Sequence, residues 1–223
     1  MRYLLDIILL LLLIFEMCFL YLPRFLHELF GVALLLPVLI HLWQNRFYLK
    51  SLFKGQWTLP RVLSALVNFF LVLNFLAVVI SGCMISYFLF KDLVPLSLRR
   101  DPALFAMHST AARCFFITAG LHFGLHLDAW RGKLQRAAGI THFSGVGRML
   151  TAAAVVAVGA AGIFAAVQDK LWQRLQGAHV FMTPALRYDT AGYILTQLGI
   201  FLLFAEIGWM LWRLVLRAKA KKA

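Results

Sequence analysis

The dominant pattern in the chain is a succession of long apolar segments separated by short polar ones. A stretch of about 20 mainly apolar residues matches the length needed to cross a hydrocarbon core of about 30 Å. Helices are the expected spanning element, because a helix satisfies its own backbone hydrogen bonds inside lipid. We therefore predict six spanning helices, at residues 3–21, 25–44, 61–89, 102–128, 147–167 and 190–215.

The first and third segments differ from the others. Asp6 and Glu16 interrupt the first segment and no small-residue cleavage site follows it, which favours a retained helix over a signal peptide. The third segment runs from Leu59 to Phe90 and is longer than one crossing needs. A helix of that length is expected to tilt or to extend past the membrane surface.

Positive charges are unevenly distributed over the connecting segments. The chain has 223 residues, of which 62% are hydrophobic and 14% charged, and its net charge is +13. With a cytoplasmic N-terminus, the inner segments hold 14 of the 22 Lys and Arg residues, the outer loops hold seven, and Arg113 lies within a span. This bias predicts that both termini are cytoplasmic. It explains the basicity by membrane topology rather than by a nucleic-acid partner.

Four histidines inside the predicted spans share one spacing. His27 and His41 lie in the second segment, and His108 and His122 lie in the fourth, each pair 14 positions apart. In a helix, 14 residues return to within about 40° of the same face and rise about 21 Å. Histidine within a span is a functional hypothesis by default, with hydrogen bonding between helices as the structural alternative.

The second and fourth spans run in the same direction, so packing them together brings His27 level with His108 and His41 level with His122. Two facing imidazoles at each level are the ligands that two hexacoordinate b-type haems require. Covalent c-type attachment is excluded because the chain has no Cys-x-x-Cys-His motif. His126, one turn beyond His122, is an alternative inner ligand because 18 residues return it to the azimuth of His108.

Other residues near the histidines are candidates for contact with a cofactor. Gly31, Gly120 and Gly124 lack side chains that would keep a porphyrin from the backbone, although close helix packing also explains small residues there. Arg24 lies three residues before His27, where it is placed either to pair with a haem propionate or to anchor the helix at the interface.

One further charged residue lies deep within a predicted span. Arg113 points about 140° away from His108, which predicts a partner on another helix rather than a haem propionate. Glu206 in the sixth span is a candidate partner, with a proton or quinone site as the alternative role for Arg113.

Three stretches of the chain resemble the flavinylation-associated cytochrome family of small bacterial membrane proteins. They read "HLWQNRFYLKSLFKGQWT" at 41–58, "VISGCMIS" at 79–86 and "FAMHSTAARCFFITAGLHFGLHLDAW" at 105–130. The resemblance is strongest from about 25 to 130. The chain departs from the family where Tyr87 and Phe88 replace a common Arg-His pair, so any outer contact made by that pair is not expected here.

The resemblance implies haem b ligation by histidines at the positions of His27, His41, His108 and either His122 or His126. It also implies a place in the bacterial inner membrane and electron exchange with an extracytoplasmic protein that carries covalent FMN, or with another redox subunit.

These observations predict an all-α integral membrane protein with a haem-binding four-helix core and two additional helices. Its parts are expected to be a first transmembrane helix (1–24), a dihaem cytochrome b core (25–130), and a cytoplasmic loop with two further helices and a basic tail (131–223). The expected function is transmembrane electron transfer. The alternatives are a cytochrome b anchor of a quinone-linked oxidoreductase and a haem-free transporter or scaffold.

Overall fold

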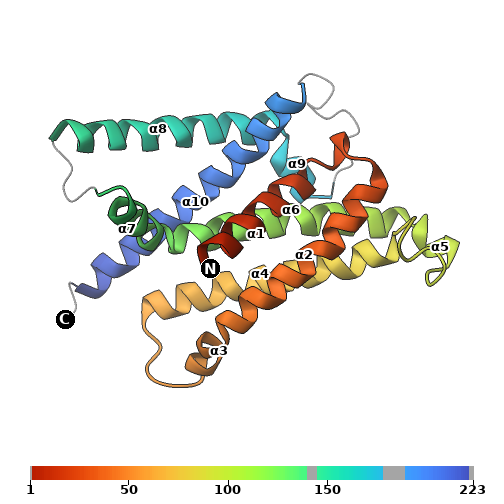
Figure 1. Ribbon diagram of the computed structural model, residues 1–223, viewed down its shortest axis with the longest axis horizontal. Coiled ribbons are helices and arrows are strands. Elements are labelled where there is room, and N and C mark those ends of the chain that lie inside the picture. The colour runs from red at the N-terminus through yellow and green to blue at the C-terminus, as the bar shows by residue number, and fades with distance from the viewer. Residues whose placement is uncertain (1, 140–144, 178–188, 221–223) are drawn as a thin grey trace.

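The computed structural model describes residues 2–139, 145–177 and 189–220, and every regular element within them is a helix. Six long helices follow the order expected from the apolar segments (Figure 1). They are α1 (Arg2–Met17), α2 (Arg24–Gln44), α4 (Leu59–Met84), α6 (Pro102–Leu125), α8 (Gly145–Gln168) and α10 (Thr190–Ala220). Shorter helices lie between them: η1 (Phe19–Tyr21), α3 (Arg46–Leu52), α5 (Leu96–Arg99), α7 (Leu127–Ala137) and α9 (Leu171–Leu175).

Five of the long helices, α2, α4, α6, α8 and α10, are long and apolar enough to cross a membrane. The predicted first span is shorter than expected, because the chain leaves the α-helix at Met17 and continues as the 3₁₀ turn η1. With 16 residues, α1 is about 24 Å long. The structure confirms the all-helical architecture and five candidate spans, whereas a sixth crossing by α1 stays a prediction.

The third span also ends earlier than predicted. The helix α4 stops at Met84, and the chain that follows is attached to α2 instead. The Glu28 carboxylate accepts four hydrogen bonds of 2.7–3.1 Å, from the Ser86 hydroxyl and from the backbone N–H groups of Tyr87, Phe88 and Leu89. Satisfying these donors with one carboxylate stabilises a turn where the apolar pattern alone predicts continued helix.

The helix α6 lies at the centre of the packing (Figure 1). It packs against α4 on one side and α10 on another, and α8 packs on α10, while α1 and α2 form a separate hairpin. The core includes Phe116 of α6 with Ile200 and Phe201 of α10, and Leu13 and Met17 of α1 join it. These contacts hold the α1–α2 hairpin beside the central helices.

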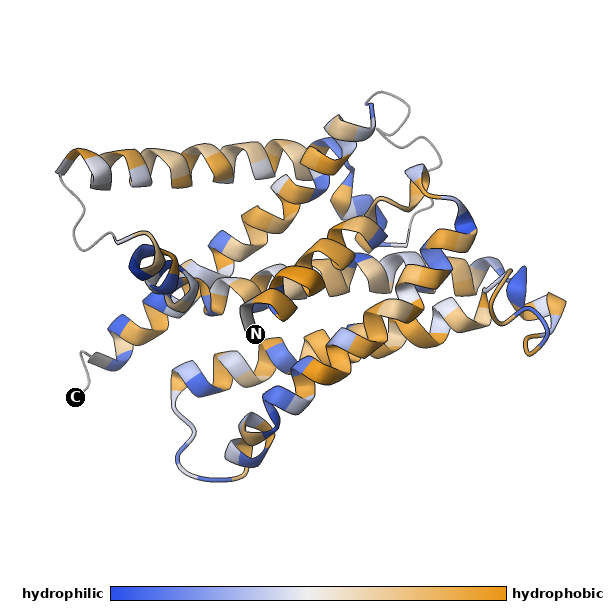
Figure 2. Ribbon diagram, viewed as in Figure 1, coloured by the Kyte–Doolittle hydropathy of each residue, from blue (hydrophilic) through white to orange (hydrophobic). Residues whose placement is uncertain are grey.

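Hydrophobic residues run along most of each long helix (Figure 2), and many of their side chains are exposed. Leu36 of α2, Phe69 of α4 and Val156 of α8 are 65%, 61% and 72% exposed. Soluble monomers rarely expose contiguous apolar surface on this scale. The helices are therefore apolar enough to sit in a lipid bilayer.

Arg113 is buried in a polar network, but Glu206 is not its partner. Its Nη1 atom donates a 2.8 Å hydrogen bond to Gln197 Oε1 and lies 3.2 Å from Asp169 Oδ2. Gln197 is nine residues, or about 14 Å, closer than Glu206 to the N-terminus of α10, which matches the depth of Arg113. The expectation of a partner on another helix is confirmed, and the choice of Glu206 is wrong. Arg174 completes the network, with Nε 3.4 Å from Asp169 Oδ2.

We predict that Asp169→Ala strongly destabilises the fold, because it leaves the guanidinium groups of Arg113 and Arg174 buried without their anion. Breaking a buried pair in this way costs about 3–5 kcal/mol. The control is Asp128→Ala, which removes a half-exposed ion pair with Arg213 (2.9 Å) and a hydrogen bond from Trp209 Nε1 (2.9 Å), and it is expected to cost less, about 1–2 kcal/mol. Thermal unfolding in detergent compares the two variants, and equal losses would show that the network is not a structural anchor.

Candidate functional site

Two pairs of histidines connect α2 with α6. The ring centres of His27 and His108 lie 6.2 Å apart, and those of His41 and His122 lie 6.3 Å apart. Because the N-terminal histidine of α2 meets the N-terminal one of α6, the two helices run in the same direction. The pairing expected from the common 14-residue spacing is therefore present, and the role of these histidines as metal ligands stays a prediction.

The rings meet where α2 and α6 make little close backbone contact. Among the described residues, α2 packs its backbone closely on α1, whereas α6 packs on α4 and α10. The His27 and His41 side chains are 29% and 30% exposed. Side chains thus bridge two helices whose backbones stay apart.

The spacing of each pair matches that of two axial ligands on one iron. Metal–nitrogen bonds of about 2 Å and a ring radius of about 1 Å place two axial imidazoles about 6 Å apart, centre to centre. Both pairs have this separation. Within the described residues, no three His, Cys, Asp or Glu side chains gather to hold a metal ion, but an axial pair needs only two because a porphyrin supplies four nitrogens.

The α6 histidines are held through Nδ1 by neutral groups of α4. His108 Nδ1 lies 3.1 Å from the Val78 carbonyl oxygen and 3.2 Å from Ser81 Oγ. His122 Nδ1 lies 2.7 Å from Asn68 Oδ1. A carbonyl or amide oxygen here accepts the Nδ1–H proton, which leaves Nε2 of that ring with its lone pair.

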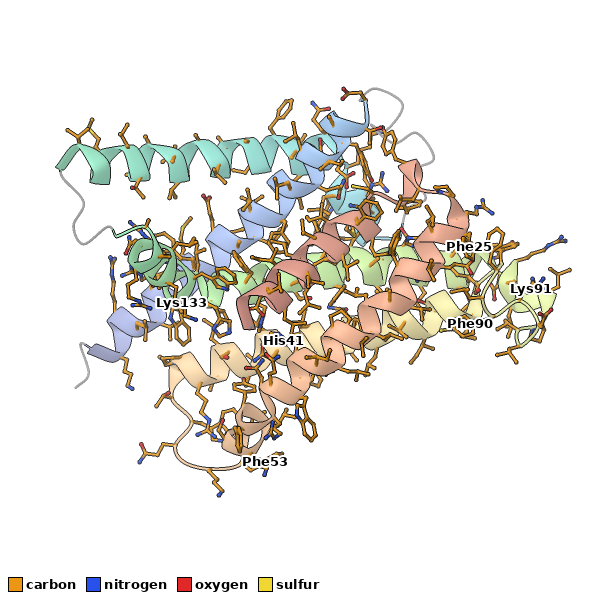
Figure 3. The ribbon with its side chains drawn as sticks, in the orientation of Figure 1. Phe25, His41, Phe53, Phe90, Lys91 and Lys133 are labelled. Carbon is orange, nitrogen blue, oxygen red and sulfur yellow. The ribbon has the colours of Figure 1, made fainter. Side chains whose placement is uncertain are left out.

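The α2 histidines are held through the same atom by carboxylates of α1. His27 Nδ1 lies 2.8 Å from Glu16 Oε2, and His41 Nδ1 lies 3.2 Å from Asp6 Oδ1. The first contact is short but lies off the N–H direction, so it is a close polar contact rather than an aligned hydrogen bond. Figure 3 labels His41 on α2, beside the N-terminal part of α1 that carries Asp6.

Each of the four Nδ1 atoms therefore lies within 3.2 Å of an oxygen atom, and Nε2 is the nitrogen left to bind a metal. Metal-ligating histidines usually have their second nitrogen engaged by a carboxylate or a carbonyl, which fixes the tautomer and the ring orientation. The donor set, the spacing and the engaged Nδ1 atoms together fit bis-histidine ligation of haem.

His126 occupies a different position from His122. It is the exposed residue between α6 and α7, and its ring centre lies 4.9 Å from that of His122. His122 is the histidine whose ring pairs with His41 and whose Nδ1 has a partner in α4. The structure therefore favours His122 as the ligand, with His126 as its neighbour.

The three glycines proposed for cofactor approach have different neighbours. A Cβ atom added at Gly120 would lie 3.0 Å from the Phe201 carbonyl oxygen, and one added at Gly124 would overlap that of Ala205. Helix α10 fills the space beside both glycines, so the close packing of α6 on α10 accounts for these small residues. Gly31 instead faces the Glu16 carboxylate, because a Cβ atom added at Gly31 would lie 3.6 Å from Glu16 Oε2.

Arg24 and Gly82 complete the surroundings of the His27/His108 pair. The Arg24 guanidinium lies over the Tyr87 ring, 5.7 Å from its centre, in a cation–π contact. A Cβ atom at Gly82 would lie 3.1 Å from His108 Cε1. Gly82 thus gives the His108 ring room against α4, a role that sequence reasoning missed although "SGCM" lies in a stretch that it singled out.

Sequence reasoning also missed the partners of Nδ1. Asp6 and Glu16 were used only to argue against a signal peptide, yet a carboxylate in an apolar span is itself a signal that a polar partner lies nearby. Asn68 is likewise a polar residue within an apolar span, and it meets His122 of the neighbouring helix α6.

Comparison of the chain with family models, with curated proteins and with solved structures finds no match. The resemblance to the flavinylation-associated cytochromes therefore enters the functional argument as a hypothesis, and the geometry of the histidines carries the rest.

We predict that Gly124→Ala lowers the stability of the protein without changing the haem content of the folded fraction. The added methyl group pushes α10 from α6, and overpacking of this kind costs about 1–3 kcal/mol. Gly145→Ala is the matched control, because its Cβ would meet nothing within 4 Å. Thermal unfolding and haem quantitation measure both effects, and selective haem loss from folded Gly124→Ala would return this glycine to the cofactor site.

Proposed function

We propose that the protein is an integral membrane cytochrome b that carries electrons across the bilayer through two haem b groups. His27 and His108 would hold one haem, and His41 and His122 the other. The observation that carries the proposal is the pair of facing imidazoles at each of two levels, each with its Nδ1 within 3.2 Å of an oxygen atom. When bound, haem b supplies reversible one-electron chemistry at its iron.

The chain's own residues would bind and orient these groups. The 14-residue spacing separates the two histidine levels by about 21 Å along the helix axis, which is much of a hydrocarbon core. The partners of Nδ1 keep each Nε2 free for iron, and the surrounding apolar helices exclude water. An uninterrupted route between two membrane faces follows from stacking two such levels on the same two helices.

The distribution of charges supports an orientation for this route. We propose that α1 is a sixth span, that both termini are cytoplasmic and that the protein lies in the bacterial inner membrane. The positive-inside bias supports this arrangement. It assigns the His27/His108 pair to the extracytoplasmic side and the His41/His122 pair to the cytoplasmic side.

The extracytoplasmic partner would be a flavoprotein with covalently attached FMN, or another redox subunit. The support is the resemblance carried by the three stretches between residues 41 and 130.

We predict that the purified protein shows low-spin b-type bands and contains two haems per chain. His27→Ala and His108→Ala should each remove one and the same haem, while His41→Ala and His122→Ala remove the other, halving the haem content. His126→Ala is the control and should retain both haems. Reduced-minus-oxidised spectra with pyridine-haemochrome quantitation measure this.

Three results would change the proposal. Haem loss in His126→Ala but not in His122→Ala would reassign the cytoplasmic-side ligand. One haem per wild-type chain would favour a simple membrane anchor. No haem in folded protein expressed with ample haem would overturn the proposal in favour of a transporter or scaffold.

One feature favours the quinone-linked anchor as a second candidate. An open groove of about 460 Å³ lies between α4, α6 and α9, with Asn74, Thr110 and Gln176 as polar groups among apolar ones. This volume is within the range of small-molecule sites.

We predict that a short-chain quinol reduces the haems of the wild type and that Ala106→Trp, which fills the groove, slows this reduction at least tenfold. Equal rates in the two proteins would remove the groove from the function.

A further inference from the structure

The two acidic residues of α1 both contact ligand-bearing α2. Glu16 Oε2 lies 2.8 Å from His27 Nδ1, and Asp6 Oδ1 lies 3.2 Å from His41 Nδ1. The side chains of Glu16 and Asp6 are 12% and 28% exposed. A carboxylate within an apolar helix is energetically costly, so two of them, each meeting one histidine, call for a functional explanation.

The α6 histidines have partners of a different chemical kind. The groups at Nδ1 of His108 and His122 are a backbone carbonyl, a hydroxyl and an amide, all from α4. Each facing pair thus combines one imidazole beside a carboxylate with one beside neutral groups. The division follows the helices, because α1 serves α2 and α4 serves α6.

The surroundings of Glu16 support a specific position for its charge. Its Oε1 atom is buried and has no hydrogen-bond partner among the described residues. Gly31 lies one turn after His27, and a Cβ atom added there would lie 3.6 Å from Glu16 Oε2. A glycine at this position leaves room for the carboxylate beside the ring, so the packing of α1 on α2 directs the charge to His27.

A carboxylate at Nδ1 changes the imidazole as a ligand. It favours the tautomer with its proton on Nδ1, and where it accepts that proton it raises the basicity of Nε2 and fixes the ring orientation. A more basic axial ligand and a nearby negative charge both stabilise the ferric over the ferrous iron, because the ferric centre carries one more positive charge. The expected result is a lower midpoint potential than neutral partners would produce.

We propose that α1 is a tuning helix, in which Glu16 and Asp6 are positioning residues that orient the α2 ligands and lower the potentials of the two haems separately. Glu16 acts on the haem of the His27/His108 pair, and Asp6 acts on that of the His41/His122 pair. This inference rests on the proposed function.

The test uses Glu16→Gln and Asp6→Asn in the full-length protein. Both substitutions keep the side-chain size and an oxygen acceptor while removing the charge. The control is Glu206→Gln, because Glu206 is a buried acid of another span whose Oε2 faces Gly159 of α8 rather than a histidine. Potentiometric titration of the haem bands measures each potential, and electron paramagnetic resonance of the oxidised protein reports the axial ligand field.

We expect Glu16→Gln to raise the potential of only the haem that His27→Ala removes. Asp6→Asn should raise only that of the haem removed by His41→Ala. The low-spin signal of the same haem should shift, and Glu206→Gln should leave both haems unchanged. Selective loss of the corresponding haem, with the other retained, would equally support the assignment.

Unchanged potentials and signals in both variants, with two haems bound, would overturn the tuning role and leave the cytochrome proposal intact. Equal shifts in Glu206→Gln would overturn it too, since the effect would then be a general one of lost charge. Absence of haem from the wild type would overturn both proposals, so the two failures are distinguishable.

Discussion

A polar group inside an apolar helix needs a partner on a neighbouring helix, and much of this structure follows from that requirement. Unsatisfied polar groups cost several kcal/mol where water is absent. His108, His122 and Arg113 meet the requirement through side chains or carbonyl groups of other helices, and Glu28 meets it through the loop after α4. These contacts set how α1, α2, α4, α6 and α10 lie relative to one another, and they also orient the candidate ligands.

The apolar pattern and the histidine spacing predicted the features that one helix determines by itself. A helix repeats every 3.6 residues whatever surrounds it, so His27 and His41 share a face before any packing is known. The two histidine pairs and five candidate spans follow from this local geometry. The short α1 was not predicted, because a 3₁₀ turn at Phe19–Tyr21 is as apolar as the helix before it.

Features that depend on which faces meet could not be predicted in the same way. Gly120 and Gly124 allow α10 to pack closely on α6. A single sequence does not show whether a missing side chain makes room for a helix or for a cofactor. Arg113 contacts Asp169 and Gln197 rather than Glu206, because the packing of α8 and α10 brings the first two residues to its level. Likewise, the contacts of the α1 carboxylates with the histidines depend on the packing of α1 on α2, which the sequence alone does not show.

The Glu28 carboxylate has a mechanical consequence. Four donors from residues 86–89 converge on it, and it is the residue directly after His27. The loop therefore belongs to the same rigid body as α2, although the chain reaches it from α4. A displacement of this loop would therefore move α2, and the His27 imidazole with it, because the loop is hydrogen-bonded directly to the residue after His27.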